Sequence, residues 1–334
     1  MTLLRALRAP LLLAVFFLAL DRLLDASLSS YYMRVLTLAG INVILAVSLN
    51  LVNGMTGQFS IGHAGFMAIG AYTSAALSVY AGAPLIDALA QTLPTGLVRI
   101  AYFPIPLVVG GLVAALAGLV VSVPALRLRG DYLAIATLGA GEIIRIAILN
   151  IDAVGGARGF SLASPTLPGV DLRFESLAGV YGTMALTVAA IGRLAYSGGG
   201  LAFRAVREDE TAAASLGIAT TRVKVEAFLV ASFFAGVAGA LFAHSEGYIH
   251  TNSFSFVRSF EIVAFVVLGG LGSLSGAILA AATLTAAPEV LRGIGEWRMV
   301  LYSLLLIVTM LLRPQGLLGQ RELWPISLLV SRRT

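Results

Sequence analysis

The chain is a succession of apolar runs, each close to the length needed to cross a lipid bilayer. Clear examples are residues 32–52, 105–123, 132–149 and 176–196, and a bilayer is spanned by roughly 20 residues in helical form. Backbone amides cannot stay unpaired in lipid, so runs of this length are expected to be helices. Hydrophobic residues make up 58% of the chain and charged residues 12%, which leaves too little polar surface for a water-soluble protein of 334 residues.

We therefore predict an all-α, polytopic membrane protein with about ten transmembrane helices, within a range of nine to eleven. Further spans are expected at residues 6–24, 63–80, 224–243 and 298–312, and a broken pair at 259–268 and 277–291. No change of composition divides the chain, so residues 1–334 are expected to form a single transmembrane domain.

Basic residues indicate the orientation. Arg5 and Arg8 precede the apolar run 11–20 in the layout of a signal peptide, but no small-x-small cleavage site follows, which favours an uncleaved first helix. Other basic residues on the same predicted side are Arg127, Arg129, Arg321, Arg332 and Arg333. The positive-inside rule then predicts that both termini are cytoplasmic. The net charge of +5 is distributed between apolar runs rather than gathered on one face, so binding to nucleic acid is not expected.

A charged segment, residues 197–224, separates two apolar runs. Its charges include Arg204, Arg207, Glu208, Asp209 and Glu210, and it also carries apolar side chains. Three glycines from Gly198 are expected to break the preceding helix. Asp209 can cap a short helix over 210–216, and Gly217 can end it in a left-handed conformation. We interpret the segment as a rigid, exposed knob suited to docking; the alternative is a solvated loop.

Two glycine-rich breaks interrupt the apolar pattern. Residues 53–65 contain polar Gln58, Ser60 and His63 among four glycines, and 269–276 read GGLGSLSG. Broken helices near the bilayer midplane often bind substrate in transporters, so these three polar residues are candidates for a translocation pathway. The alternative for the first break is a tight packing turn.

Other features have plainer interpretations. The stripe of Gly110, Ala114 and Gly118 favours close helix packing. Glu142 and Arg145 are three residues apart and are expected to form a structural ion pair.

The sequence has no cysteine, so metal sites with cysteine ligands are excluded. A metal site is not expected at positions 244–250 either, because the two histidines and the glutamate there lack the spacing of known metal-binding motifs and would lie on an outer loop. The predicted outer loops are 81–104, which can include a short surface helix, and 150–175, which could contact an extracytoplasmic partner.

The motif RAVREDETAAASLGI, residues 204–218, resembles the coupling loop of ABC-importer permeases. Similar blocks follow the same family's order: GQFSIGHAGFMAIGAY from Gly57, LRLRGDYLAIATLGAGEIIRI from Leu126, AFLVASFFAGVAGALFAH from Ala227 and VVLGGLGSLSGAILAA from Val266. Together they resemble the branched-chain amino acid permeases of the LivH/LivM group, nearer to LivM. The resemblance places Glu210, Ala212, Ala213 and Gly217 at the tip that contacts the ATPase.

This resemblance implies an ABC-importer permease fold in the bacterial inner membrane. It also implies a second, homologous permease subunit, two ATP-binding subunits and an extracytoplasmic substrate-binding protein. The substrates would be leucine, isoleucine and valine, with urea, short amides or other amino acids as alternatives. No cofactor is implied.

The sequence contains no GxxxxGK[ST] phosphate-binding loop, so ATP would be hydrolysed by a separate subunit and this chain is not expected to be an enzyme. A secondary transporter is the main alternative class, but the breaks lack the acidic residues that ion coupling would need. An intramembrane enzyme is remote, because no nucleophile–base pair stands out.

Overall fold

The computed structural model describes residues 29–92, 94–128, 130–162, 176–313, 315–319 and 321–323. Within this part of the chain the fold is a bundle of α-helices with one two-stranded ribbon. The long helices are α2 (Ser30–Asn50), α3 (His63–Thr92), α5 (Pro104–Ala125), α6 (Asp131–Leu149), α7 (Leu177–Ala195), α10 (Thr220–Glu246) and α12 (Leu274–Val290). The shorter ones are α4 (Thr95–Tyr102), α8 (Gly198–Glu208), α9 (Glu210–Ser215), α11 (Phe256–Gly269) and α13 (Arg298–Leu312).

Eight segments of the described residues are long and apolar enough to cross a membrane, and α13 is a shorter apolar helix. The all-α, polytopic architecture is thus confirmed. The predicted first span, residues 6–24, lies outside the described residues.

Helix α10 forms the centre of the bundle and packs against α5, α3 and α2. Its contact face is built from small residues. Gly236 lies where α10 crosses α5 and α3. A methyl group added there would come within 2.5 Å of Ala114 Cβ and 2.8 Å of Gly110 O, both on α5. The stripe on α5 therefore has the predicted packing role. Without side chains between them, the backbones approach closely and dispersion contacts replace the hydrophobic driving force that lipid cannot supply.

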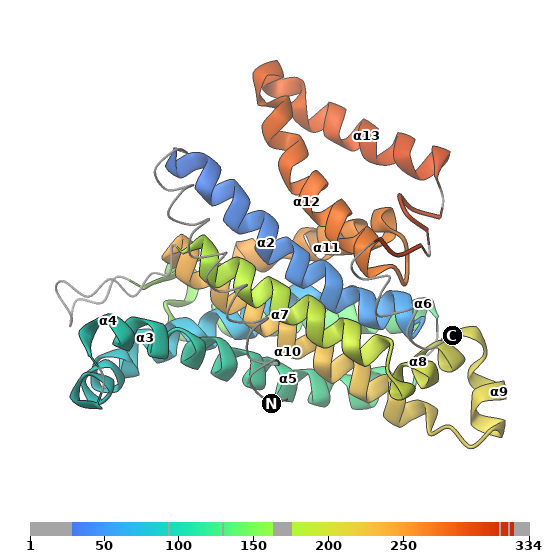
Figure 1. Cartoon of the computed structure of the whole chain (residues 1–334), viewed down its shortest axis with the longest axis horizontal. Helices are drawn as coiled ribbons and strands as arrows, with labels where there is room; N and C mark the ends of the chain where they lie inside the picture. Colours follow the sequence, from blue (N-terminus) through green and yellow to red (C-terminus); the bar gives the residue numbers. More distant parts are fainter. Residues whose placement is uncertain are drawn as a thin grey trace, which may run out of the picture.

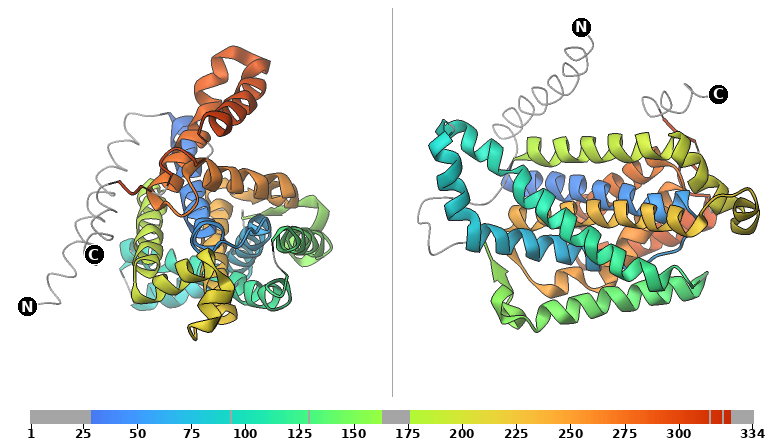
Figure 2. Two further views of the ribbon diagram at one scale, coloured as in Figure 1. Left: turned by 90° about the vertical axis from the view of Figure 1, so that its right-hand side faces the viewer. Right: turned by 90° about the horizontal axis from the view of Figure 1, so that it is seen from below.

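The two ends of the bundle are distinct. Helices α8 and α9 lie at one end, which we call the charged end, and the C-terminal part of α3 with α4 lies at the other (Figure 1 and Figure 2). At that opposite end, β1 (Phe160–Ser161) pairs antiparallel with β2 (Tyr248–Ile249). The pairing ties the connection after α6 to the connection after α10. Helices α12 and α13 project from one side of the bundle (Figure 1).

Two local predictions are wrong. Residues 81–92 are helical and continue α3 through Pro84, because Leu85 and Leu89 pack with Tyr102 of α4 in a small apolar cluster; α4 is the predicted surface helix. The predicted break is confirmed, because α7 ends at Ala195 just before the glycines that follow Ser197. The same glycines then begin α8, since the Ser197 side chain accepts a hydrogen bond from Gly200 N.

The second wrong prediction concerns His244, which lies inside α10 and not on an outer loop. Its ring is fully buried, 2.9 Å from Ser78 Oγ and 2.8 Å from Ala240 O. Burial against α3 lets the helix continue to Glu246 before Gly247 ends it with a left-handed conformation.

Candidate functional site

The first helix break lies directly after α2. The helix widens into a π turn, η1 (Leu51–Met55), and the chain then runs without helical structure to His63. Asn53 supports this stretch from within, because its amide donates to Ser60 O (3.2 Å) and accepts from Ser60 N (3.1 Å). Ile61 N donates to Thr137 Oγ1 on α6 (3.1 Å). Protein groups thus replace the water that an exposed backbone would need, as membrane proteins require.

The three predicted pathway residues are all buried in this chain. Ser60 is held by Asn53, and His63 Nε2 lies 2.9 Å from Ser48 Oγ on α2. Gln58 differs, because neither polar atom of its buried side-chain amide has a hydrogen-bond partner among the described residues. Two of the three side chains therefore have local structural partners, and Gln58 retains free hydrogen-bonding capacity. A pathway role for the three residues stays a prediction.

The second break joins α11 to α12 and meets the first one. Gly270 and Gly272 have φ angles of +114° and +91°, which an L side chain rarely adopts. Asn50, at the end of α2, accepts from Gly272 N (2.9 Å) and donates to Ser273 O (2.9 Å). A methyl group on Gly54 would lie 2.3 Å from Gly272 N, so only glycine fits between the two breaks.

Arg207 connects α8 to this seam, which consists of Asn50, Gly54, Gly57, Gly272 and Ser273. Its Nη1 donates to Gly54 O (3.1 Å), and a methyl group on Gly272 would lie 3.0 Å from Nη1. Gly57, with φ of +69°, packs against the Arg207 stem. The Arg207 side chain therefore points into the bundle, and a role for Arg207 in coupling to the ATPase stays a prediction.

Both breaks consequently lie beside α8 at the charged end. Their predicted position near the bilayer midplane stays a prediction. The path of the chain brings the two breaks together: α2 runs its full length before it breaks, and α11 reaches the same region before Gly270 turns the chain back.

The charged segment folds at its tip as predicted. The Asp209 carboxylate accepts from Thr211 N (2.8 Å) and Ala212 N (3.0 Å) at the start of α9, and Gly217 ends the turn with φ of +84°. Ala212 is exposed, whereas Ala213 is buried against the segment itself. Leu216, at the tip, is 80% exposed.

The charges of this segment are mostly paired within the chain. Glu210 forms an ion pair with Lys224 at 2.7 Å, and the Lys224 side chain is only 9% exposed. Glu208 Oε1 accepts from Nε (3.1 Å) and Nη2 (2.6 Å) of Arg207. Arg204 donates to Ala195 O (3.3 Å) and lies 5.4 Å from the centre of the Tyr196 ring. The Glu210–Lys224 pair thus ties α9 to the start of α10, and the Arg204 hydrogen bond ties α8 to the end of α7.

Glu322, near the C-terminus, was missed by sequence reasoning. Its carboxylate accepts from Leu274 N (2.7 Å) and Ser275 N (2.9 Å) at the start of α12, from the Ser275 hydroxyl, and from the Tyr196 hydroxyl (2.7 Å). It thus caps a helix more than 40 residues away, and its charge lies at the positive end of the helix dipole. Nothing in its local sequence marks this role.

Tyr196 links Glu322 to the charged segment. Burial, reinforced by the hydrogen bond and negative charge of Glu322, raises the pKa of Tyr196 well above its ordinary value. The phenol therefore stays protonated and donates to Glu322, while the Arg204 guanidinium lies over its ring. The second break and the charged segment are thereby joined at a second point.

We expect Glu322→Ala to destabilise the folded protein, because it leaves the buried N–H groups of Leu274 and Ser275 without their acceptor. Each such loss costs about 1–3 kcal/mol. The measurement is thermal unfolding of the purified subunit in detergent. Asp131→Asn is the control, since Asp131 is an exposed acid in the first turn of α6 whose side chain does not cap that helix. A loss no larger than that of the control would contradict the capping role.

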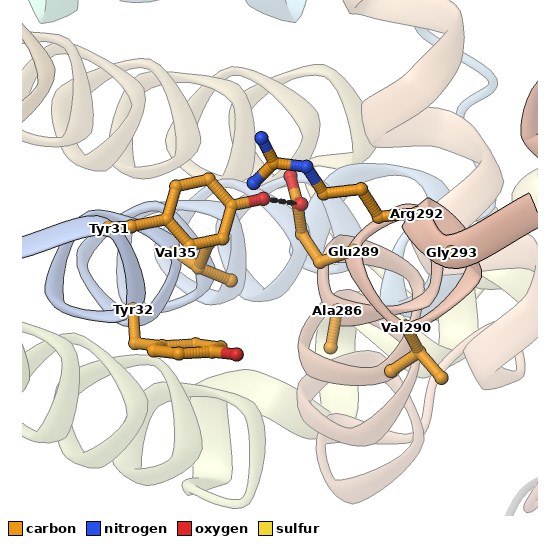
Figure 3. A pocket seen from close by; sticks show the side chains of 8 residues that line it. All are labelled: Tyr31, Tyr32, Val35, Ala286, Glu289, Val290, Arg292 and Gly293. Carbon is orange, nitrogen blue, oxygen red and sulfur yellow. Dashed lines mark hydrogen bonds between the residues drawn. The ribbon is translucent and has the colours of Figure 1, made fainter. Parts of the chain in front are cut away.

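A separate cleft of about 630 Å³ opens at the opposite end of the bundle, between the start of α2 and the end of α12. Figure 3 shows the Tyr31 hydroxyl directed at the Glu289 carboxylate, to which it donates a hydrogen bond. The Arg292 guanidinium lies 4.6 Å from the centre of the same ring. These contacts hold α12 against α2, and the cleft is remote from the seam.

The architecture and the seam define a class: a multi-pass, all-helical membrane permease whose helix breaks meet a charged helical segment at one end. The chain belongs to the family described as branched-chain amino acid transport system / permease component, whose profile matches residues 31–312.

Individual relatives agree with this membership. The chain is 39% identical to the high-affinity branched-chain amino acid transport system permease protein LivM of Salmonella typhimurium, over 84% of this chain and 68% of that protein. Identity to LivM of Escherichia coli is 38% over the same shares. LivH of Salmonella typhimurium is 28% identical, over 86% of this chain and 94% of LivH. The chain is therefore closer to LivM than to LivH, and no solved structure matches it.

Proposed function

We propose that this chain is one permease subunit of an ATP-binding-cassette importer for branched-chain amino acids in the bacterial plasma membrane. A second, related permease subunit would complete the pathway, two separate ATP-binding subunits would supply the energy, and an extracytoplasmic binding protein would deliver the substrate. The names of the relatives support the substrate class. The assignment to an ATP-driven importer is supported mainly by one observation: Arg207 joins the charged segment to both helix breaks.

The tip of the charged segment has the form of a docking element. Leu216 exposes 80% of its surface beside Gly217, while Phe203 and Val206 of α8 are buried in the body of the chain. A large apolar side chain exposed at such a tip would be stabilised by burial against a partner. We propose that Ala212, Leu216 and Gly217 contact the ATPase and that the paired charges behind them keep the tip rigid.

This proposal sets the orientation. The charged end faces the cytoplasm, in line with its basic residues, and both termini lie on that side. The opposite end, with η2 (Asp152–Val154), η3 (Gly156–Arg158) and the β1–β2 ribbon, faces the binding protein. The ribbon gives that face a fixed shape, which a docking surface for a second protein needs.

We expect Leu216→Ala to weaken assembly with the ATP-binding subunits about tenfold, because the variant buries less apolar surface against the partner. The measurement is the affinity of the purified permease pair for the ATPase subunits, followed by ATP-dependent uptake of L-leucine in vesicles. Leu186→Ala is the matched control: this leucine, 63% exposed on α7, lies outside the charged segment.

Equal affinities for the wild type and Leu216→Ala would show that the tip does not dock. Uptake driven by a proton gradient without ATP would instead favour a secondary transporter. Uptake of urea or short amides in place of L-leucine would retain the machine type and change its substrate.

A further inference from the structure

Helix α11 carries two charged residues inside a segment that is apolar enough to span the membrane. Arg258 and Glu261 are three residues apart within Thr251–Gly269, and Arg258 Nη1 lies 2.6 Å from Glu261 Oε2. Charged side chains within a span are costly, and they persist mainly where they pair and serve substrate or ion movement. Neither residue belongs to the seam or the charged segment.

The depth of this pair follows from its hydrogen bonds. Arg258 Nη2 donates to Asn42 Oδ1 (2.5 Å), and Asn42 Nδ2 donates to Thr285 Oγ1 (2.8 Å). Asn42 lies near the middle of the span Ser30–Met55, and Thr285 near the middle of Leu274–Gly295. The ion pair is therefore near the midplane, the depth at which transporters commonly bind substrate.

The pair lies at the edge of an open face of α11. The Glu261 side chain is 42% exposed and that of Arg258 is 17% exposed. Three apolar neighbours share this exposure: Phe256 (52%), Val257 (60%) and Phe260 (48%). A carboxylate exposed to this extent cannot face hydrocarbon without a large penalty, so the face must line a water-filled path or a protein boundary. Helix α11 lies at the foot of the projecting α12 and α13 (Figure 1).

The chemistry of this face matches a zwitterion with an apolar side chain. Arg258 presents a planar guanidinium that can donate two parallel hydrogen bonds to a carboxylate, and Glu261 can accept from an ammonium group. Val257 is four residues before Glu261 and so lies on the same side of α11 as the carboxylate. The rings of Phe256 and Phe260, with centres 6.3 Å apart, continue this apolar surface on the far side of Val257. When the ion pair opens to admit such a ligand, each charge exchanges one opposite partner for another, so no charge is left unpaired.

We propose that Arg258 and Glu261 bind the α-carboxylate and α-ammonium groups of an amino acid in transit, with its aliphatic side chain against Val257 and Phe260 on the Glu261 side of the helix. The inference rests on the proposed function and narrows it: the site requires both charges of the substrate, which urea and simple amides lack. This permease, and not only the binding protein, would then recognise the two opposite charges of the amino acid.

The chain contains a matched control pair. Glu142 and Arg145 on α6 are also three residues apart, lie 2.7 Å from each other, and are 27% and 21% exposed. Their geometry is nearly the same, but the proposal gives them no substrate. Removing the negative charge from each pair in turn therefore separates recognition from the general cost of breaking an ion pair.

The test uses the full importer, reconstituted in vesicles with its ATPase and binding-protein subunits, and radiolabelled L-leucine. We expect Glu261→Gln to lower uptake at least about tenfold, the loss of roughly 1.4 kcal/mol of substrate binding, with assembly unchanged. Glu142→Gln should transport at the wild-type rate, and Glu261→Asp should recover part of the loss. Equal uptake by Glu261→Gln and an active wild type would overturn the site and leave the importer function intact.

A second measurement does not depend on how Glu261→Gln folds. The chain has no cysteine, so Val257→Cys is a unique label. We expect it to react with a small aqueous thiol reagent in the assembled importer and to be protected by L-leucine during turnover. Val120→Cys, at a position 73% exposed on α5, should stay unlabelled in lipid. A Val257→Cys importer that never reacts would overturn the site, whereas a wild type without ATP-dependent L-leucine uptake would overturn the proposed function itself.

Discussion

Replacing Arg207 with alanine is expected to lower coupled transport about a hundredfold while the subunits still assemble. Arg207 donates to Gly54 O, packs on Gly57 and lies against Gly272, so a single side chain connects α8 to both helix breaks. A hydrogen bond from a charged donor contributes about 1.5–3 kcal/mol, which at the upper limit corresponds to about a hundredfold in an equilibrium or a rate. Without the Arg207 side chain, a movement of α8 would no longer displace the residues of the seam.

The measurement is the ratio of L-leucine taken up to ATP hydrolysed in the same vesicles. Arg222→Ala is the control, because Arg222 is in the same charged segment but is 80% exposed and pairs only with Glu226. Arg207→Lys should give an intermediate ratio, since lysine keeps the charge and loses the planar fork. An Arg207→Ala importer with the wild-type ratio would show that the seam is a static packing contact.

The contacts around Arg207 suggest how closure of the ATPases could reach the membrane. Asn50 binds both Gly272 and Ser273, so the ends of α2 and α11 and the start of α12 are joined before Arg207 contacts them. Glu322 joins α12 to Tyr196 at a second point. Displacement of α8 would thus act on both breaks together. Coupling of this kind needs a contiguous element with two arrangements, and the seam is the candidate.

Local chemistry explains which features the sequence could predict. The Asp209 cap and the left-handed Gly217 depend on neighbours within a few residues, and both are confirmed. The pair Glu142 and Arg145 is likewise set by helical spacing and is confirmed. The long membrane spans could also be predicted, because the length of an apolar run is enough to identify a helix that crosses the bilayer.

Features that depend on distant segments could not be predicted. The direction of Arg207 follows from a break 153 positions earlier in the chain, and the role of Glu322 from a helix start 48 positions earlier. Pro84 indicated a loop, but it is carried inside α3 because the residues after it pack on α4. For the pathway residues, the sequence could show that Gln58, Ser60 and His63 avoid lipid, but not that Asn53 and Ser48 would bind two of them.

Gly70→Ala is expected to destabilise the bundle by about 3 kcal/mol, at the upper end of the usual cost of overpacking. Gly70 lies where α3 crosses α10, and its added methyl group would be 2.1 Å from Gly236 O and 2.3 Å from Gly236 Cα. Both atoms are backbone, so no side chain can rotate away and the helices must separate. Separation also disturbs α5, because Gly110 packs against both Gly70 and Gly236.

The measurement is the thermal unfolding temperature of the purified subunit in detergent, together with the amount that accumulates in the membrane. Gly139→Ala is the matched control: Gly139 is also inside a helix, yet its added methyl group would meet no atom within 4 Å. That variant should be neutral or stabilised by about 0.5–1 kcal/mol, since alanine loses less backbone entropy than glycine in a helix. Gly70→Ala as stable as Gly139→Ala would mean that α3 and α10 do not cross at Gly70, and that the glycine contact does not set the distance between these two helices.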